Sequence, residues 1–188
     1  MRELPVRKPN RLKGYDYRNQ GAYFVTICTH KRYEIFGQIP VGEGLALPAD
    51  IDTNIPIIQL SDYGKIAENE ITKIEQHYDC VFTNCFVIMP NHVHLIIYLL
   101  DNAGKAGVDA GRASPSPTLG NVIGGYKSGV SRLCGFPVWQ RSFHDHIIRN
   151  EDEYNKIAAY IENNPITWKD DCFYPTQPNS FSVGVSSN

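Results

Sequence analysis

The chain has 188 residues and a formal net charge of −2, with 42% hydrophobic and 11% aromatic residues. This length favours one domain, and this composition excludes a wholly disordered chain. Five cysteines without a C-x-x-C pair exclude a disulfide framework or a zinc cluster and predict reduced thiols. No apolar stretch approaches the roughly 18 residues that span a bilayer, and the N-terminus lacks an apolar secretory segment, so we expect a cytoplasmic protein with no membrane partner.

The first part of the chain predicts a basic arm followed by a hairpin. Residues 1–20 carry six basic and two acidic side chains, a local balance of +4. Residues 22–29 alternate as a strand does, and residues 35–39 are the expected partner strand across a turn. Residues 40–56, with three prolines and three acidic residues, predict a loop.

The middle of the chain predicts a helix and two apolar strands. Ser61 is a candidate N-cap for a helix over 62–77, with Ile66, Ile71 and Ile74 facing inward. Residues 80–89 and 92–100 then predict two strands separated only by Pro90 and Asn91. Both faces of the second strand are apolar apart from its histidines, so we expect it at the centre of the sheet.

His92 and His94 are the most informative residues of this central strand. Alternate residues share a face, so the two imidazoles project together at a backbone spacing of about 7 Å. That spacing allows two ring nitrogens to share one divalent cation. The alternative is a pair of hydrogen-bonded core histidines without a metal.

The next segments predict a flexible excursion and a helix. Residues 101–118 are rich in small residues and proline and have no apolar period. A helix follows, with Lys127 and Arg132 outward and available to phosphate. Its inward positions are Leu119, Val122, Ile123, Tyr126 and Val130. Its glycines either permit close packing on the sheet or on DNA, or simply lie on the surface.

A basic segment with a second H-x-H pair follows. Residues 121–149 have four basic side chains and one acidic side chain, a balance of +3. Trp139 either stacks on a base or packs in the core. We rank His144 and His146 below the first pair and expect a strand or turn that lines the site.

Residues 150–165 predict a helix that carries Tyr160. Asn150 is a candidate N-cap, acidic residues occupy the first turn, and Pro165 ends the helix. Tyr160 and Asn164 are four residues apart, so a phenol and an amide point toward one spot. The alternative is an aromatic residue that only packs in the core or at its boundary.

Four segments in this order resemble the single-tyrosine HUH transposases, in particular the REP-associated tyrosine transposase branch. The resemblance covers roughly residues 7 to 169. The segments are Arg7–Tyr17, Met89–His94, Val138–Arg141 and Tyr160–Pro165.

The resemblance implies an α+β fold of ferredoxin-like HUH nuclease architecture, with a central antiparallel sheet of about four to five strands flanked by helices. Residues 1–20 would form the arm, 21–170 the single domain and 171–188 the tail. The resemblance also implies cleavage and rejoining of single-stranded DNA through a covalent 5′-phosphotyrosine. By position, His92 and His94 match the metal ligands, Tyr160 matches the nucleophile and Asn164 completes the metal site.

The chemistry requires these residue types. A phosphodiester is anionic, so a divalent ion must polarise one of its oxygens, and we expect Mg²⁺ or Mn²⁺. A tyrosine hydroxyl, with a free pKa near ~10, needs assistance in losing its proton. The sequence does not identify the base.

The expected partner is single-stranded DNA with a hairpin, bound by two basic segments that face one surface; the alternative is solvated charge without a ligand. Two other functions stay open: a domain that binds a DNA or RNA hairpin without cutting it, and a phosphodiesterase that uses water. The protein is expected to be a monomer or a homodimer, with the monomer favoured. The expected DNA contacts are Arg7, Lys8, Arg11, Lys13, Lys127, Arg132, Trp139 and Arg141.

Overall fold

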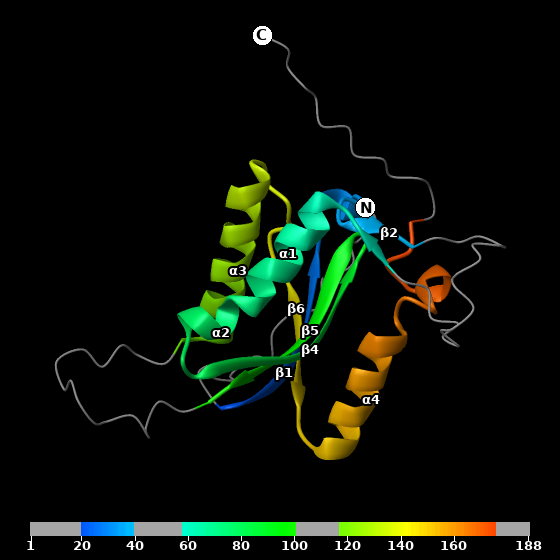
Figure 1. Cartoon of the computed structure of the whole chain (residues 1–188). Coiled ribbons are helices and arrows are strands. Elements are labelled where there is room, and N and C mark those ends of the chain that lie inside the picture. Colours follow the sequence, from blue (N-terminus) through cyan, green and yellow to red (C-terminus); the bar gives the residue numbers. More distant parts are fainter. Residues whose placement is uncertain (1–19, 40–57, 101–116, 176–188) are drawn as a thin grey trace, which may run out of the picture.

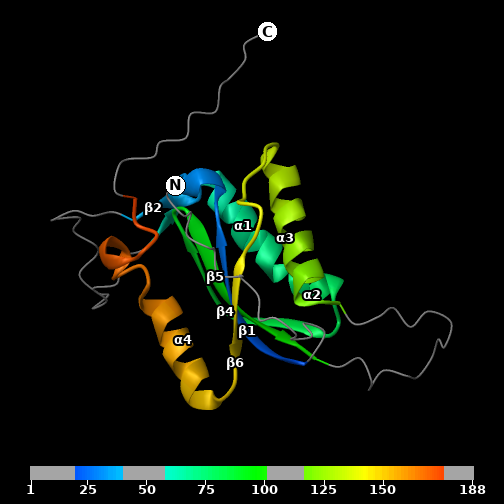
Figure 2. The same ribbon diagram turned by 180° about the vertical axis from the view of Figure 1, so that it is seen from behind.

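The structure, a computed structural model, describes residues 20–39, 58–100 and 117–175. In these residues a four-stranded antiparallel sheet has helices on both of its faces, as Figures 1 and 2 show. The expected arm, the loop at 40–56, most of the excursion and most of the tail lie outside the described residues. No helix within them is long and apolar enough to cross a bilayer.

The sheet places the histidine-bearing strand in its interior. The strand order is β4–β5–β1–β6, and every neighbouring pair is antiparallel. β5 therefore has a partner on each side, as its apolar faces predicted. The strands are β1 (Gly21–Cys28), β4 (Val81–Met89), β5 (His92–Leu99) and β6 (His144–Ile148).

The predicted hairpin between residues 22–29 and 35–39 is wrong. Both edges of β1 are already occupied, by β5 on one side and β6 on the other. After β1 the short helix η1 (His30–Arg32) turns the chain away, with Lys31 and Arg32 in the left-handed region at φ 52° and 57°. β2 (Gly37–Gln38) instead pairs with β3 (Gln59–Leu60).

One face of the sheet is covered by α1 (Asp62–Thr72), α2 (Ile74–His77) and α3 (Leu119–Cys134). Ser61 caps α1 as predicted, because its hydroxyl accepts a hydrogen bond from the Gly64 N–H at 3.1 Å. All five side chains that the apolar period placed on the inward face of α3 are buried. This face holds the larger hydrophobic core.

The other face is covered by α4 (Glu151–Asn163), which begins at the predicted Asn150 cap. Ile161 of α4 packs with Ile96 of β5 and Ile148 of β6 in a second, smaller core. Because side chains alternate along β5, His92 and His94 lie on this α4 face. After α4 the chain forms the short helix η3 (Trp168–Asp170). The fold thus brings the late helix onto the surface that carries the histidines.

Glycines of the helices serve close packing between elements rather than contact with the sheet. A Cβ at Gly129 of α3 would collide with the Glu70 carboxylate of α1, and a Cβ at Gly64 would collide with the Phe36 carbonyl. By contrast, a Cβ at Gly124 would meet open space. Gly64 and Gly124 therefore form a matched pair for measuring the free energy of unfolding.

We predict opposite effects on stability for Gly64→Ala and Gly124→Ala. Alanine is better than glycine in a helix by about 1 kcal/mol, so Gly124→Ala should raise the free energy of unfolding by about that amount. At Gly64 the clash with backbone outweighs this gain, and we expect a loss of about 1 to 3 kcal/mol. Urea unfolding measures both values, and an equal effect of the two substitutions would contradict the packing.

Candidate metal and tyrosine site

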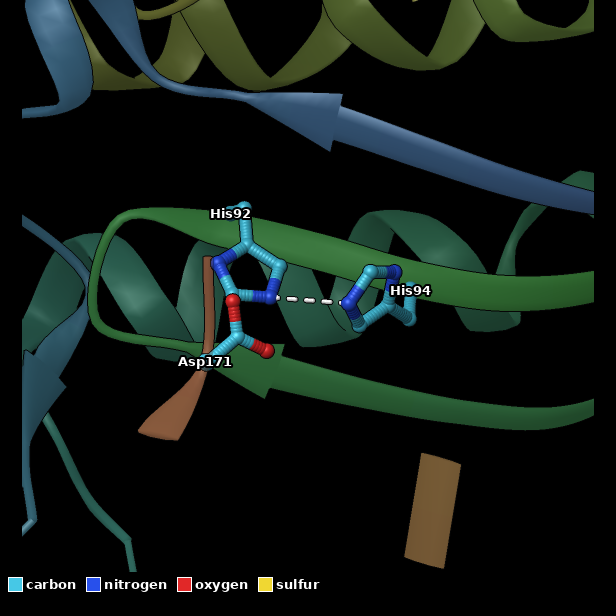
Figure 3. A group of neighbouring side chains, drawn as sticks. All are labelled: His92, His94 and Asp171. Atoms are coloured by element: carbon cyan, nitrogen blue, oxygen red, sulfur yellow. Dashed lines mark hydrogen bonds between the residues drawn. The ribbon is translucent and has the colours of Figure 1, made fainter. Parts of the chain in front are cut away.

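The two histidines of β5 face each other inside the protein. His92 is 0% exposed and His94 is 1% exposed, and their Nε2 atoms lie 3.0 Å apart (Figure 3). Two ligands held at right angles about 2.1 Å from one ion would lie about 3 Å apart. The spacing of the two nitrogens therefore suits a shared cation.

The other nitrogen of each ring is already hydrogen-bonded. His92 Nδ1 lies 2.9 Å from Asn91 Oδ1, and His94 Nδ1 lies 2.9 Å from Thr26 Oγ1. An amide oxygen only accepts, so His92 carries its proton on Nδ1 and directs an unprotonated Nε2 inward. If Thr26 likewise accepts, two lone pairs face each other, an arrangement that a cation between them would stabilise. The arrangement is that of metal ligands oriented by a second set of partners.

Burial keeps both rings neutral. It lowers the pKa of His94 to about 4, an effect that the Asp171 carboxylate partly opposes. Burial and the neighbouring His94 lower the pKa of His92 well below its usual range. At neutral pH both imidazoles therefore offer lone pairs rather than charge.

Tyr160 reaches this pair from α4 of the same chain. Its hydroxyl lies 3.3 Å from His94 Nε2 and donates a hydrogen bond to Asp171 Oδ2 at 3.2 Å. The side chain is 42% exposed, so one side of the phenol remains open to solvent. Burial and the nearby carboxylate of Asp171 raise the pKa of Tyr160 to about 12. The hydroxyl is thus protonated at neutral pH and already points toward an acceptor.

Asn164 also lies where the sequence placed it, one turn after Tyr160. Its side chain is 0% exposed, and its Nδ2 donates to Asp171 Oδ2 at 2.9 Å. Its Oδ1 is buried and has no hydrogen-bond partner among the described residues. A buried amide oxygen without a partner is costly unless a ligand satisfies it.

Asp171 is the site residue that sequence reasoning missed. One of its carboxylate oxygens and the ligand nitrogens of His92 and His94 all lie within 4.8 Å of one another, and Figure 3 shows the carboxylate beside the two rings. The residue follows the helix stop at Pro165 and belongs to no motif, so the sequence places it in the tail at 171–188. Its acidity was the only signal, and many exposed acidic residues share it.

The segment that carries Asp171 packs over the histidines. The Phe173 ring lies 4.6 Å from the His92 ring, and the Phe173 carbonyl accepts a hydrogen bond from Asn91 Nδ2 at 2.9 Å. The Phe173 N–H donates to Asp171 Oδ1 at 2.6 Å. The Arg32 guanidinium lies 4.9 Å from the centre of the Phe173 ring. These contacts hold the carboxylate beside the rings and account for the burial of both histidines.

The expected DNA contacts divide into three groups. Arg7, Lys8, Arg11 and Lys13 lie outside the described residues. Arg132 and Arg141 are exposed, as expected. Trp139 and Lys127 form the third group: Trp139 is buried, and Lys127 is half-buried with its ammonium bound to backbone carbonyls.

Trp139 is only 8% exposed, packs against Phe36 and Tyr126, and donates its indole N–H to the Lys127 carbonyl. Core packing, the alternative given for it, is what the structure shows, and no open ring face is left for a base. Lys127 turns inward rather than outward. Its ammonium donates to the carbonyls of three residues of the following segment: Gln140 at 2.7 Å, Arg141 at 3.3 Å and Ser142 at 3.3 Å.

The second H-x-H pair forms part of β6, and its two histidines do not join the first pair. His146 Nε2 lies 2.7 Å from a carboxylate oxygen of Glu153, near the start of α4. His144 is exposed and lies opposite Thr26, the partner of His94, in the strand register. His146 therefore connects β6 to α4, whereas His144 makes no such connection within the described residues.

Known proteins resemble this chain in sequence or in fold. An uncharacterized protein of Haemophilus influenzae is 35% identical over 181 residues, which cover 89% of this chain and 93% of that protein. No family model matches the chain. A solved REP-associated tyrosine transposase bound to a REP hairpin matches with a TM-score of 0.54 at 17% identity, over 98% of this chain and 95% of that one.

These similarities define the class of the protein. The chain has the α+β fold of the REP-associated tyrosine transposase, with a four-stranded antiparallel sheet flanked by helices, as the four segments predicted. It belongs to one family with the protein of Haemophilus influenzae. At 17% identity the structural match establishes the fold alone. The chemistry depends on the residues of the site.

We predict that acid destabilises the protein through His94. The folded-state pKa of His94 is about 4 and the ordinary value is 6.5, so as the pH falls the unfolded chain takes up this proton first. The stability that the neutral ring provides is present above pH 6.5 and is lost as the pH falls toward 4. At pH 5 we expect a loss of about 2 kcal/mol relative to pH 7 from this group.

Urea unfolding in the presence of EDTA at both pH values measures the loss. His94→Leu should show a smaller difference between pH 7 and pH 5, whereas the exposed His77→Gln should behave as the unmodified protein does. An undiminished pH dependence in His94→Leu would refute the role of this imidazole.

Proposed function

We propose that this protein is a metal-dependent transposase that nicks and rejoins single-stranded DNA beside a hairpin through a covalent link between Tyr160 and a 5′ phosphate. The observation that carries the proposal is the convergence of three groups from two distant parts of the chain, β5 and α4. The Tyr160 hydroxyl lies 3.3 Å from His94 Nε2, which itself lies 3.0 Å from His92 Nε2. Packing alone would not require these polar atoms to converge.

We assign His92, His94 and Asp171 as the residues that hold the metal, with Asn164 beside them. Two imidazoles and one carboxylate suit Mn²⁺ better than Mg²⁺, which prefers oxygen ligands, and the carboxylate cancels part of the ionic charge that neutral ligands alone would leave. The unpartnered Asn164 Oδ1 supports a fourth ligand atom at this place, the second that is an oxygen. When bound, the ion supplies positive charge that polarises an oxygen of the phosphodiester.

Tyr160 and Asp171 carry the proposed covalent step. As the phenol oxygen forms a bond to phosphorus, its proton passes to Asp171 Oδ2, which already accepts the hydrogen bond from this hydroxyl. The bond from phosphorus to the 3′ oxygen breaks, and that oxygen leaves with the bonding electrons and takes a proton from water. In resealing, a 3′-hydroxyl attacks phosphorus and gives its proton to water, the bond from phosphorus to the phenol oxygen breaks, and the phenol oxygen recovers a proton from Asp171.

The hairpin part of the proposal rests on the structural relative, which is bound to a REP hairpin. The same fold in this chain gives a comparable scaffold. The four segments that carry the family resemblance also occur in order along this sequence. The complete set of Tyr160, the histidine pair, Asp171 and Asn164 supports cleavage over binding alone. A reaction on chromosomal DNA would take place in the cytoplasm.

We predict a covalent adduct between the protein and labelled single-stranded DNA that carries a hairpin, formed in the presence of Mn²⁺ or Mg²⁺. Tyr160→Phe should abolish the adduct because it removes the only atom that bonds to phosphorus in the proposed step. Tyr154→Phe, a substitution on the same helix, is the matched control and should leave the adduct unchanged. Denaturing gel electrophoresis detects the labelled protein.

The same assay separates the alternatives. DNA cleavage without an adduct would indicate hydrolysis by water and would overturn the proposal. Binding without cleavage would indicate a domain that only recognises the hairpin, which would also overturn it.

We also predict that Asp171→Ala weakens Mn²⁺ binding by at least about tenfold, since the loss of one orienting group already has this effect at many metal sites. Asp170→Ala removes an exposed neighbouring carboxylate and should leave the affinity unchanged. Electron paramagnetic resonance of free Mn²⁺ measures binding without DNA and without turnover. Equal affinities for the two variants would exclude Asp171 as a ligand.

A further inference from the structure

We propose that Arg32 is a positioning residue for the metal site, and that a strained turn at Lys31 and Arg32 presents its guanidinium to the segment that carries Asp171. This role rests on the proposed function, because it requires that Asp171 holds a metal ion. Three features of the molecule support it: the backbone of the turn, the hydrogen bonds that hold the turn, and the contacts of the guanidinium.

The turn after β1 has an unusual backbone. Lys31 and Arg32 both lie in the left-handed region, at φ 52° and 57°, which residues other than glycine, asparagine and aspartate rarely adopt. Such a conformation costs free energy and persists only where the surrounding structure imposes it. Backbone strain of this kind is concentrated at functional sites, so two consecutive strained residues point to a function of this turn.

The turn is held by Thr29, whose side chain is 0% exposed. The Thr29 N–H donates to the Asn91 carbonyl at 2.9 Å, and its hydroxyl lies 3.0 Å from the same carbonyl and 2.8 Å from the Tyr33 carbonyl. The Arg32 N–H in turn donates to the Thr29 carbonyl at 3.0 Å. Because Asn91 directly precedes His92, the turn is attached to the backbone beside the first histidine of the site.

The Arg32 side chain extends from this turn to the segment 171–174. Its Nη1 donates to the Cys172 carbonyl at 3.1 Å, and its guanidinium carbon lies 4.9 Å from the centre of the Phe173 ring. Cys172 directly follows Asp171, and the Phe173 N–H donates to the Asp171 carboxylate. The guanidinium thus restrains the two residues that set the direction of this carboxylate.

The sign of the effect of Arg32 on metal affinity distinguishes positioning from charge. Burial, the neighbouring His94 and then the charge of Arg32 lower the pKa of His92, so the guanidinium is close enough to repel a cation at the site. If charge were its only effect, removal of Arg32 would strengthen Mn²⁺ binding. If Arg32 acts through Asp171, its removal weakens Mn²⁺ binding, because the carboxylate loses its place beside the rings.

The test compares Arg32→Gly with Lys31→Gly in the full chain. Glycine relieves the left-handed strain at either position, so both variants should fold, and circular dichroism checks this. Lys31 is exposed, and its side chain makes no hydrogen bond or ion pair with another described residue, so Lys31→Gly is the matched control. Hydrogen exchange in EDTA measures the protection of the Phe173 amide, and we expect faster exchange in Arg32→Gly alone.

Electron paramagnetic resonance of free Mn²⁺ then measures the metal affinity of the same variants. We expect Arg32→Gly to weaken binding by about three- to tenfold, at the low end of the usual effect of an outer partner because its contacts are exposed. Lys31→Gly should leave the affinity unchanged. Added to Asp171→Ala, Arg32→Gly should cause no further loss, since both substitutions act through one carboxylate.

Unchanged exchange of the Phe173 amide in Arg32→Gly would overturn the proposal, as would an Mn²⁺ affinity that stays the same or rises. An equal loss in Lys31→Gly, or a full further loss in the double variant with Asp171→Ala, would also overturn it. Lack of Mn²⁺ binding by the unmodified chain would overturn it together with the metal site. Neither measurement uses DNA, so the absence of a covalent adduct would overturn the proposed function alone.

Discussion

The site depends on the close approach of two neutral imidazole nitrogens in a buried place. A 3.0 Å separation between His92 Nε2 and His94 Nε2 is favourable only if something positive lies between them or if one of them carries a proton. Burial lowers the pKa of both rings and thus opposes a charged imidazolium, which leaves either a cation between the nitrogens or a neutral His94 ring that carries its proton on Nε2. The hydrogen bonds on the Nδ1 atoms prevent the rings from turning away. Together these constraints hold two neutral nitrogens at a spacing that suits a shared cation.

The rest of the fold maintains this arrangement. β5 lies in the interior of the sheet, so its backbone is held on both sides and the spacing of its alternate side chains is rigid. The second core holds α4 against the same face, which sets the approach of the Tyr160 hydroxyl. Asp171 then connects the two elements, because its Oδ2 accepts hydrogen bonds from both Tyr160 and Asn164. One carboxylate thereby orients the Tyr160 hydroxyl and the Asn164 amide together.

The two faces of the sheet also differ in burial and charge. On the α4 face, burial and neutral nitrogens suit a cation and a scissile phosphate. On the α3 face, Arg132 and Arg141 present positive charge at the surface. Lys127 belongs to this second face although its ammonium is bound by carbonyls, because it holds the Arg141 segment in place.

Much of this protein was decided by local sequence. Period-2 and period-3.6 patterns placed β4, β5, α3 and α4, and the spacing of His92, His94, Tyr160 and Asn164 placed each of them on the correct face of its element. Tertiary structure alone decided the partner of β1, the inward turn of Lys127, the burial of Trp139 and the return of Asp171 to the histidines. The physical reason is that periodicity depends only on residues close in the sequence and shows which side of an element is buried. A contact between Asp171 and β5 depends instead on how segments far apart in the sequence pack together.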